Sequence, residues 1–182
     1  MPREPKARPA GVPKVPGRIV AGLGEAIADP RRHPGAYIRL TAAGGVHGEA
    51  YEFEFRIDAS GRITSRMRDE LYGRALSDAG RGGQREDPGR FSALARAIDI
   101  EALLRADVEA GRYPPDTVVG RLEVSDGQQS ASFTFPADEG QAARARVRMP
   151  DALRRAVDAV YAMAAAYLGD QHLKPGAEAQ GR

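Results

Sequence analysis

The sequence alternates strictly between apolar and charged residues over Tyr51–Ile57, which reads YEFEFRI. Because successive side chains of a strand point to opposite faces of a sheet, this period of two predicts a strand with one buried face and one solvated face. A three-residue loop, Ala59-Ser60-Gly61, would then pair Ile57 with Ile63 and keep the apolar side chains together. That register also puts Gly61 where a left-handed backbone is needed. The pattern therefore predicts a β-hairpin over residues 50–67.

A second hairpin is predicted over residues 117–135, TVVGRLEVSDGQQSASFTF. Asp126-Gly127 is typical of a two-residue turn, which would place Val124 opposite Gln129 and Gly120 opposite Phe133. In this register one face of the hairpin is almost wholly apolar, as expected for a sheet that is covered by helices on one side.

Two helices are indicated by their start signals and apolar spacing. Asp87-Pro88 is an N-cap followed by proline at the first helical position, and the helix is predicted to reach about Ala106 with an irregularity near Asp99. Pro150-Asp151 opens a second helix, which Gly169 is placed to end. The order hairpin–strand–helix–hairpin–helix predicts an α+β fold, with an antiparallel sheet of four to five strands and two helices packed on one face.

The chain is predicted to hold one domain between two tails. Residues 1–36 form a basic, proline-rich tail, expected to be disordered, with a short helix over 19–28. Residues 37–168 form the α+β domain, which includes a glycine-rich, flexible loop at 73–90. Residues 169–182 are a polar C-terminal tail.

The charge of the chain is concentrated in the N-terminal tail. Residues 1–18 contain five basic residues and Glu4, a net charge of +4, whereas the whole chain has +2, so residues 19–182 sum to −2. The domain is therefore not basic, which argues against nucleic acid as its partner. The sequence has no apolar run of membrane-spanning length and no signal peptide, and we expect a cytoplasmic protein.

The residues that usually carry chemistry are sparse. There is no cysteine, which excludes disulfides, thiolate metal ligands and thiol nucleophiles. His33, His47 and His172 stand in no metal-binding or catalytic pattern, and Glu52 and Glu54 with Arg56 are interpreted as the solvated face of a strand. We therefore expect a protein that is not an enzyme, with no catalytic residues, no metal and no cofactor.

The segment TAAGGVHGEAY, residues 41–51, lies between two predicted strands. A tight turn at Gly44-Gly45 would set Leu40 against Glu49, which is a poor match for a buried face. A wider loop over 43–48 fits the strand pattern better and displays Val46 and His47, although a plain turn remains the alternative. The predicted partner-binding residues are the members of this loop and of the second hairpin turn: Gly44, Gly45, Val46, His47, Gly48, Asp126 and Gly127.

The order of these elements, with the Gly44-Gly45-x-x-Gly48 segment between the first two strands, resembles the emfourin family of small proteins. This resemblance spans about residues 37–168. It implies a compact α+β binding domain that inhibits a thermolysin-like metalloprotease. The proline-rich tail and the 73–90 loop depart from the family. An alternative is an accessory subunit of a larger protein assembly, docked through its N-terminal arm, residues 1–36.

Overall fold

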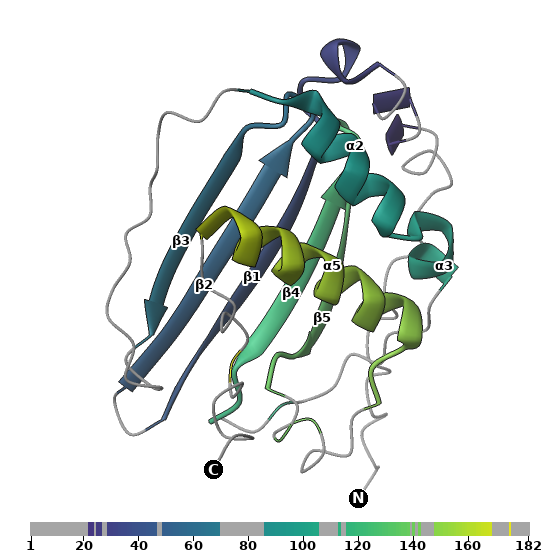
Figure 1. Ribbon diagram of the computed structural model, residues 1–182. Coiled ribbons are helices and arrows are strands. Elements are labelled where there is room, and N and C mark those ends of the chain that lie inside the picture. Colours follow the sequence, from purple (N-terminus) through teal and green to yellow (C-terminus); the bar gives the residue numbers. More distant parts are fainter. Residues whose placement is uncertain are drawn as a thin grey trace, which may run out of the picture.

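The computed structural model describes residues 22–23, 25–26, 29–46, 49–69, 86–105, 113, 116–138, 140, 142, 148–168 and 175. Within them, five antiparallel strands form one sheet in the order β3-β2-β1-β4-β5, with helices on one face (Figure 1). The α+β architecture is confirmed. The elements are η1 (Pro30–Arg32), β1 (Tyr37–Val46), β2 (Glu49–Asp58), β3 (Ile63–Asp69), α2 (Pro88–Ala97), α3 (Ile100–Arg105), β4 (Val119–Ser125), β5 (Ser130–Pro136) and α5 (Asp151–Leu168).

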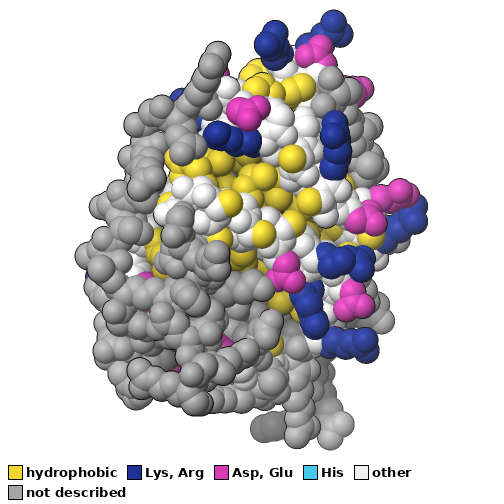
Figure 2. All heavy atoms as spheres, in the orientation of Figure 1, with side chains coloured by type: hydrophobic (Ala, Val, Ile, Leu, Met, Phe, Trp, Pro, Cys, Tyr) yellow, Lys and Arg dark blue, Asp and Glu magenta, His cyan; other side chains and the backbone are white. Residues whose placement is uncertain are grey.

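The core lies between the sheet and the helices. Leu40 of the central strand β1 sits between Phe55 of β2 and Leu122 of β4, and all three side chains are fully buried. Helix α5 closes over this layer, and its Tyr161 ring stacks on Phe53 with the ring centroids 5.1 Å apart. Figure 2 shows hydrophobic side chains gathered between α2 and α5 on the helix side, with charged side chains around them.

The helix boundaries follow from local capping. The Asp87 carboxylate accepts the Gly89 N–H at 3.0 Å, and Pro88 begins α2. Ile98 leaves helical geometry, and the Asp99 carboxylate then accepts the Ala102 N–H at 2.9 Å to start α3. The predicted irregularity near Asp99 is confirmed as a change from one helix to the next.

The turn between β2 and β3 has the predicted register, with Ile57 opposite Ile63. The Asp58 carboxylate organises the turn, because its Oδ1 accepts the Ser60 N–H, the Ser60 hydroxyl and the Arg62 N–H. Gly61 adopts a positive φ of 80°, which other residues rarely tolerate.

The turn between β4 and β5 differs from the prediction. Ser125 pairs with Ser130 and Val124 with Ala131, so the connection is a four-residue loop, Asp126–Gln129, and the predicted two-residue turn is wrong. The register moves by two residues, which leaves each side chain on its predicted face. Gly120 is covered by Phe135, whose ring would lie 2.4 Å from a Cβ at that position.

The core also extends N-terminally of Tyr37, where the sequence placed the start of the domain. Leu23, Ala26 and Ala36 are fully buried, and the Ala36 carbonyl accepts the Ala59 N–H at 2.9 Å. The proline-rich segment 1–18, most of the 73–90 loop and nearly all of the C-terminal tail lie outside the described residues. None of the helices described here has the length and apolar character needed to cross a membrane.

Candidate functional site

The predicted binding loop at the β1–β2 connection is shorter than expected. The two strands pair as far as Val46 and Glu49, so that Gly44 lies opposite Tyr51 and Gly45 opposite Ala50. The wide loop over 43–48 is therefore wrong. A turn placed three residues further along the chain sets Leu40 opposite Phe55 and satisfies the same face pattern. Only His47 and Gly48 remain between the strands, and both lie outside the described residues.

Gly44 has a structural reason to be glycine. It occupies an inward position of β1, and a Cβ there would lie 2.7 Å from the Val118 Cα and 2.9 Å from the Thr117 carbonyl oxygen. Both atoms belong to the backbone, so they cannot move aside as a flexible side chain can. This close approach fixes the base of the hairpin against the segment that enters β4.

Asp126 and Gly127, the other predicted binding residues, are engaged within the fold. Asp126 is buried, and its Oδ1 accepts the N–H groups of Gln128 and Gln129, each at 2.8 Å. Gly127 has a φ of 93°, and its backbone lies directly against Gly35. The loop is thus explained by its own hydrogen bonds and by its packing on the segment before β1.

The two predicted binding loops do not form one site. Val46 is the last residue of β1, whereas Tyr37, the first, lies opposite Ser125, just before the Asp126 loop. A ten-residue strand separates these positions by about 30 Å. A single small partner surface would therefore contact one loop or the other, and not both.

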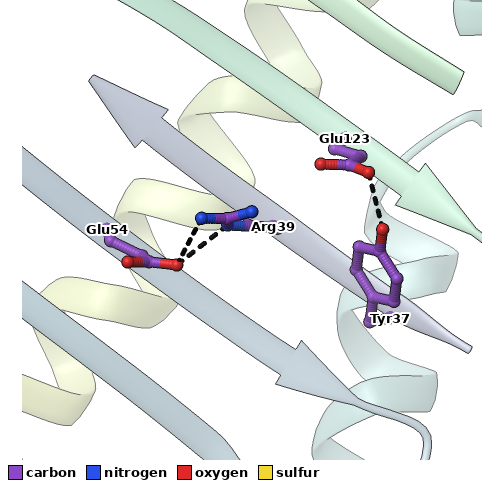
Figure 3. Close-up of polar contacts among 4 residues, drawn as sticks. All are labelled: Tyr37, Arg39, Glu54 and Glu123. Atoms are coloured by element: carbon purple, nitrogen blue, oxygen red, sulfur yellow. Dashed lines mark hydrogen bonds and ion pairs between the residues drawn. The ribbon is translucent and has the colours of Figure 1, made fainter. Parts of the chain in front are cut away.

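The face of the sheet away from the helices is polar and carries a network of side chains (Figure 3). The Tyr37 hydroxyl donates to Glu123 at 2.6 Å, which links β1 to β4. Arg39 donates a hydrogen bond from Nε to one oxygen of Glu54 at 2.8 Å, and its Nη2 forms an ion pair with the same oxygen at 2.8 Å, which links β1 to β2. The Arg56 guanidinium lies 4.4 Å from the centre of the Tyr37 ring. The other outward residues with exposed side chains are Glu52, Thr64, Arg66, Arg68, Arg121, Ser130, Ser132 and Thr134.

The environment of Tyr37 keeps its hydroxyl protonated. Partial burial raises the pKa of Tyr37, and the hydrogen bond to Glu123 and the charge of that carboxylate raise it further. The Tyr37 hydroxyl consequently remains a donor throughout the neutral pH range, and the network in Figure 3 is a fixed feature of this face.

Sequence reasoning identified part of this network. The alternation in residues 51–57 assigned Glu52, Glu54 and Arg56 to the solvated face, and Glu52 and Arg56 are indeed exposed. The parts supplied by β1 and β4, Tyr37 and Glu123, depend on the strand order, for which no local pattern gives a signal. The one available sequence signal for this network was Tyr37 itself, an aromatic residue at an outward position at the start of β1.

The histidines are not brought together by the described part of the fold. His33 Nε2 lies 3.3 Å from a carboxylate oxygen of Glu25, and His47 and His172 lie outside the described residues. No cluster of three or more potential metal ligands occurs among the residues that the structure describes.

These features define an α+β domain with one helix-covered sheet face, one open polar face and a tightly paired β1–β2 hairpin. Comparison with protein-family models finds no match, and a search of curated proteins finds no similar sequence.

Proposed function

We propose that this chain is a non-enzymatic, emfourin-like binding protein that contacts a protein partner through the tip of its β1–β2 hairpin. The partner class implied by the resemblance is a thermolysin-like metalloprotease. The observation that supports the proposal is the uninterrupted pairing of β1 with β2 up to Val46 and Glu49. This ladder already orders the two strands that carry the tip, which lowers the conformational entropy that the hairpin would lose on binding.

The base of the hairpin supports the same function. Gly44 is held against the backbone of Val118 and Thr117, and both of those residues are buried. The hairpin is therefore anchored to β4 as well as to its own partner strand. A paired two-stranded hairpin with an anchored base suits insertion into a concave site such as a protease cleft.

A direct test measures peptide hydrolysis by a thermolysin-like protease in the presence of increasing amounts of the full chain. We expect a stoichiometric loss of protease activity at micromolar protein, with the chain itself remaining uncleaved. Unchanged hydrolysis with an intact chain would remove this enzyme class as the partner. Cleavage of the chain would show that it is a substrate.

A second candidate is an accessory subunit of a larger assembly that docks through the basic N-terminal arm. The burial of Leu23 and Ala26 favours this candidate, because it anchors the chain to the core at that point. An arm formed by residues 1–18 would then be attached to the domain at a defined position. A truncation that separates the two candidates must spare these core residues and should remove only residues 1–18. Protease inhibition then survives under the first proposal, whereas assembly fails under the second.

A further inference from the structure

Four arginines meet on the open face of the sheet, where β1, β2 and β3 lie side by side. Arg39 of β1 lies directly opposite Arg56 of β2. Arg66 of β3 and Arg62 of the preceding turn flank Arg56 diagonally, since they lie opposite Glu54 and Asp58, respectively. We refer to Arg39, Arg56, Arg62 and Arg66 as the arginine cluster. Like charges directly opposite each other destabilise a sheet, so stability does not account for the Arg39–Arg56 pair.

The three carboxylates within this area are already engaged. Glu123, directly opposite Arg39, accepts the Tyr37 hydroxyl. One oxygen of Glu54 accepts a hydrogen bond from Arg39 Nε at 2.8 Å and lies 2.8 Å from Arg39 Nη2. Asp58 is held by the three hydrogen bonds of the β2–β3 turn. Four guanidinium groups against these three carboxylates leave a local charge of +1 (4 − 3), although the chain from residue 19 onward is negative.

The side chains of the cluster are accessible and partly preorganised. Arg56, Arg62 and Arg66 are exposed, and the Arg39 side chain is 40% exposed. Arg39 is oriented by Glu54, and the Tyr37 ring is oriented by Glu123 (Figure 3). The Tyr37 ring in turn orients Arg56. A guanidinium that is already oriented loses less side-chain entropy when it forms a new hydrogen-bonded pair.

We propose that the arginine cluster is a docking site for an acidic segment of a partner protein, with carboxylates placed on Arg56 and Arg66. Guanidinium groups bind carboxylates through paired, charge-assisted hydrogen bonds. The chain has only three lysines, Lys6, Lys14 and Lys174, so the presence of arginine instead of lysine on this face is not informative. The proposal is based on where the four arginines lie.

Discrete carboxylates match this face better than a continuous polyanion does. Glu52 is exposed on the same face, one row beyond Glu54, and Glu123 of β4 lies directly opposite Arg39. A nucleic-acid backbone laid across the sheet would meet these carboxylates, whereas a peptide can place acidic side chains only where the arginines are.

The test uses the full chain and a short fluorescein-labelled peptide in which glutamate alternates with serine. A matched peptide carries glutamine in place of glutamate. Binding is followed by fluorescence anisotropy at about 50 mM salt, where exposed charges are weakly screened. We expect the glutamate peptide to bind the unaltered chain. R56Q/R66Q should lower the affinity for this peptide about tenfold, as the loss of two exposed ion pairs predicts. R155Q, which removes an exposed arginine of α5, should leave the affinity unchanged.

Three outcomes would overturn the docking site: equal affinity of the glutamine peptide, equal weakening by R155Q, or an oligothymidylate that displaces the glutamate peptide at lower concentration. The last would assign the surface to nucleic acid. Unfolding midpoints of each variant show that the fold is kept. This site is independent of the hairpin, and R56Q/R66Q should therefore retain protease inhibition.

Discussion

Gly44 and Val118 approach each other so closely that a Cβ on Gly44 would stand 2.7 Å from the Val118 Cα. This contact joins the base of the β1–β2 hairpin to the segment that leads into β4. It gives Gly44 a packing role, whereas the binding role that we propose belongs to the tip of the hairpin. The residue that makes the hairpin stable is thus distinct from the residues that we expect to meet a partner.

Replacing Gly44 with alanine should destabilise the protein by about 1–3 kcal/mol, since the new methyl group must push backbone atoms apart in a packed region. Urea unfolding followed by far-UV circular dichroism measures the change. Ala43→Ser, at the neighbouring exposed position of β1, is the matched control and should stay within about 0.5 kcal/mol. A Gly44→Ala protein as stable as this control would contradict the packing role.

Gly61→Ala should be more damaging than Gly44→Ala. Its φ of 80° is unfavourable for alanine, and a Cβ would lie 1.7 Å from the Asp87 carbonyl oxygen at the start of α2. We expect a loss of about 2 kcal/mol or more, with a lower yield of folded protein. Arg62→Ala changes an exposed side chain at the next position and serves as the control. Equal thermal midpoints for the two variants would show that the start of α2 can shift to accommodate the added methyl group without loss of stability.

Asp99 is expected to act as the cap of α3 through its 2.9 Å hydrogen bond from the Ala102 N–H. Asp99→Ala should cost about 1 kcal/mol, whereas Asp99→Asn retains an acceptor oxygen and should cost much less. Chemical unfolding of the two variants side by side gives the comparison. The capping role is refuted if asparagine is no better than alanine.

Stability should fall at alkaline pH because of Tyr161. Burial raises the pKa of Tyr161 well above its ordinary value near 10, and the influence of Tyr51 offsets only part of this. The folded protein therefore keeps a proton that the unfolded chain releases above pH 10. The stabilisation is complete below that pH and declines above it, by up to about 1.4 kcal/mol per pH unit.

Urea unfolding at pH values from 8 to about 11 measures this dependence. Tyr161→Phe keeps the ring that stacks on Phe53 and removes the titrating hydroxyl, so its stability should decline less steeply. Parallel curves for the two proteins would show that Tyr161 is not the source. Some decline should persist in the variant, since burial also raises the pKa values of Tyr37 and Tyr113.

Where the sequence carries a local signal of the right kind, it predicts this fold well. The β2–β3 register was predictable because an odd loop length and the position of Gly61 together allow one alignment that keeps the faces apart. The sequence predicted one helix with an irregularity near Asp99, and the structure changes there from α2 to α3.

The errors occur where a pattern of period two cannot choose between registers. Shifting the β4–β5 pairing by two residues leaves every side chain on the same face, so Asp126-Gly127 alone could not fix the alignment. The loop is decided by the hydrogen bonds of the Asp126 carboxylate and by packing on Gly35, which lies far away in sequence. Gly44 was likewise attributed to a turn because its contact with Val118 is long-range.

We propose that the tip of the β1–β2 hairpin contacts a protease, and this contact can be measured by comparing two proteins. Inhibition of a thermolysin-like protease is followed for the unaltered chain and for V46D/H47D, at equal concentrations of folded protein. Gly44→Ala is unsuitable for this comparison, because it is expected to alter stability. We expect dose-dependent inhibition by the unaltered chain and a loss of at least about tenfold in potency for V46D/H47D, as for the central residues of an interface. Equal potency of the two proteins, or no inhibition by either, would refute the proposed contact.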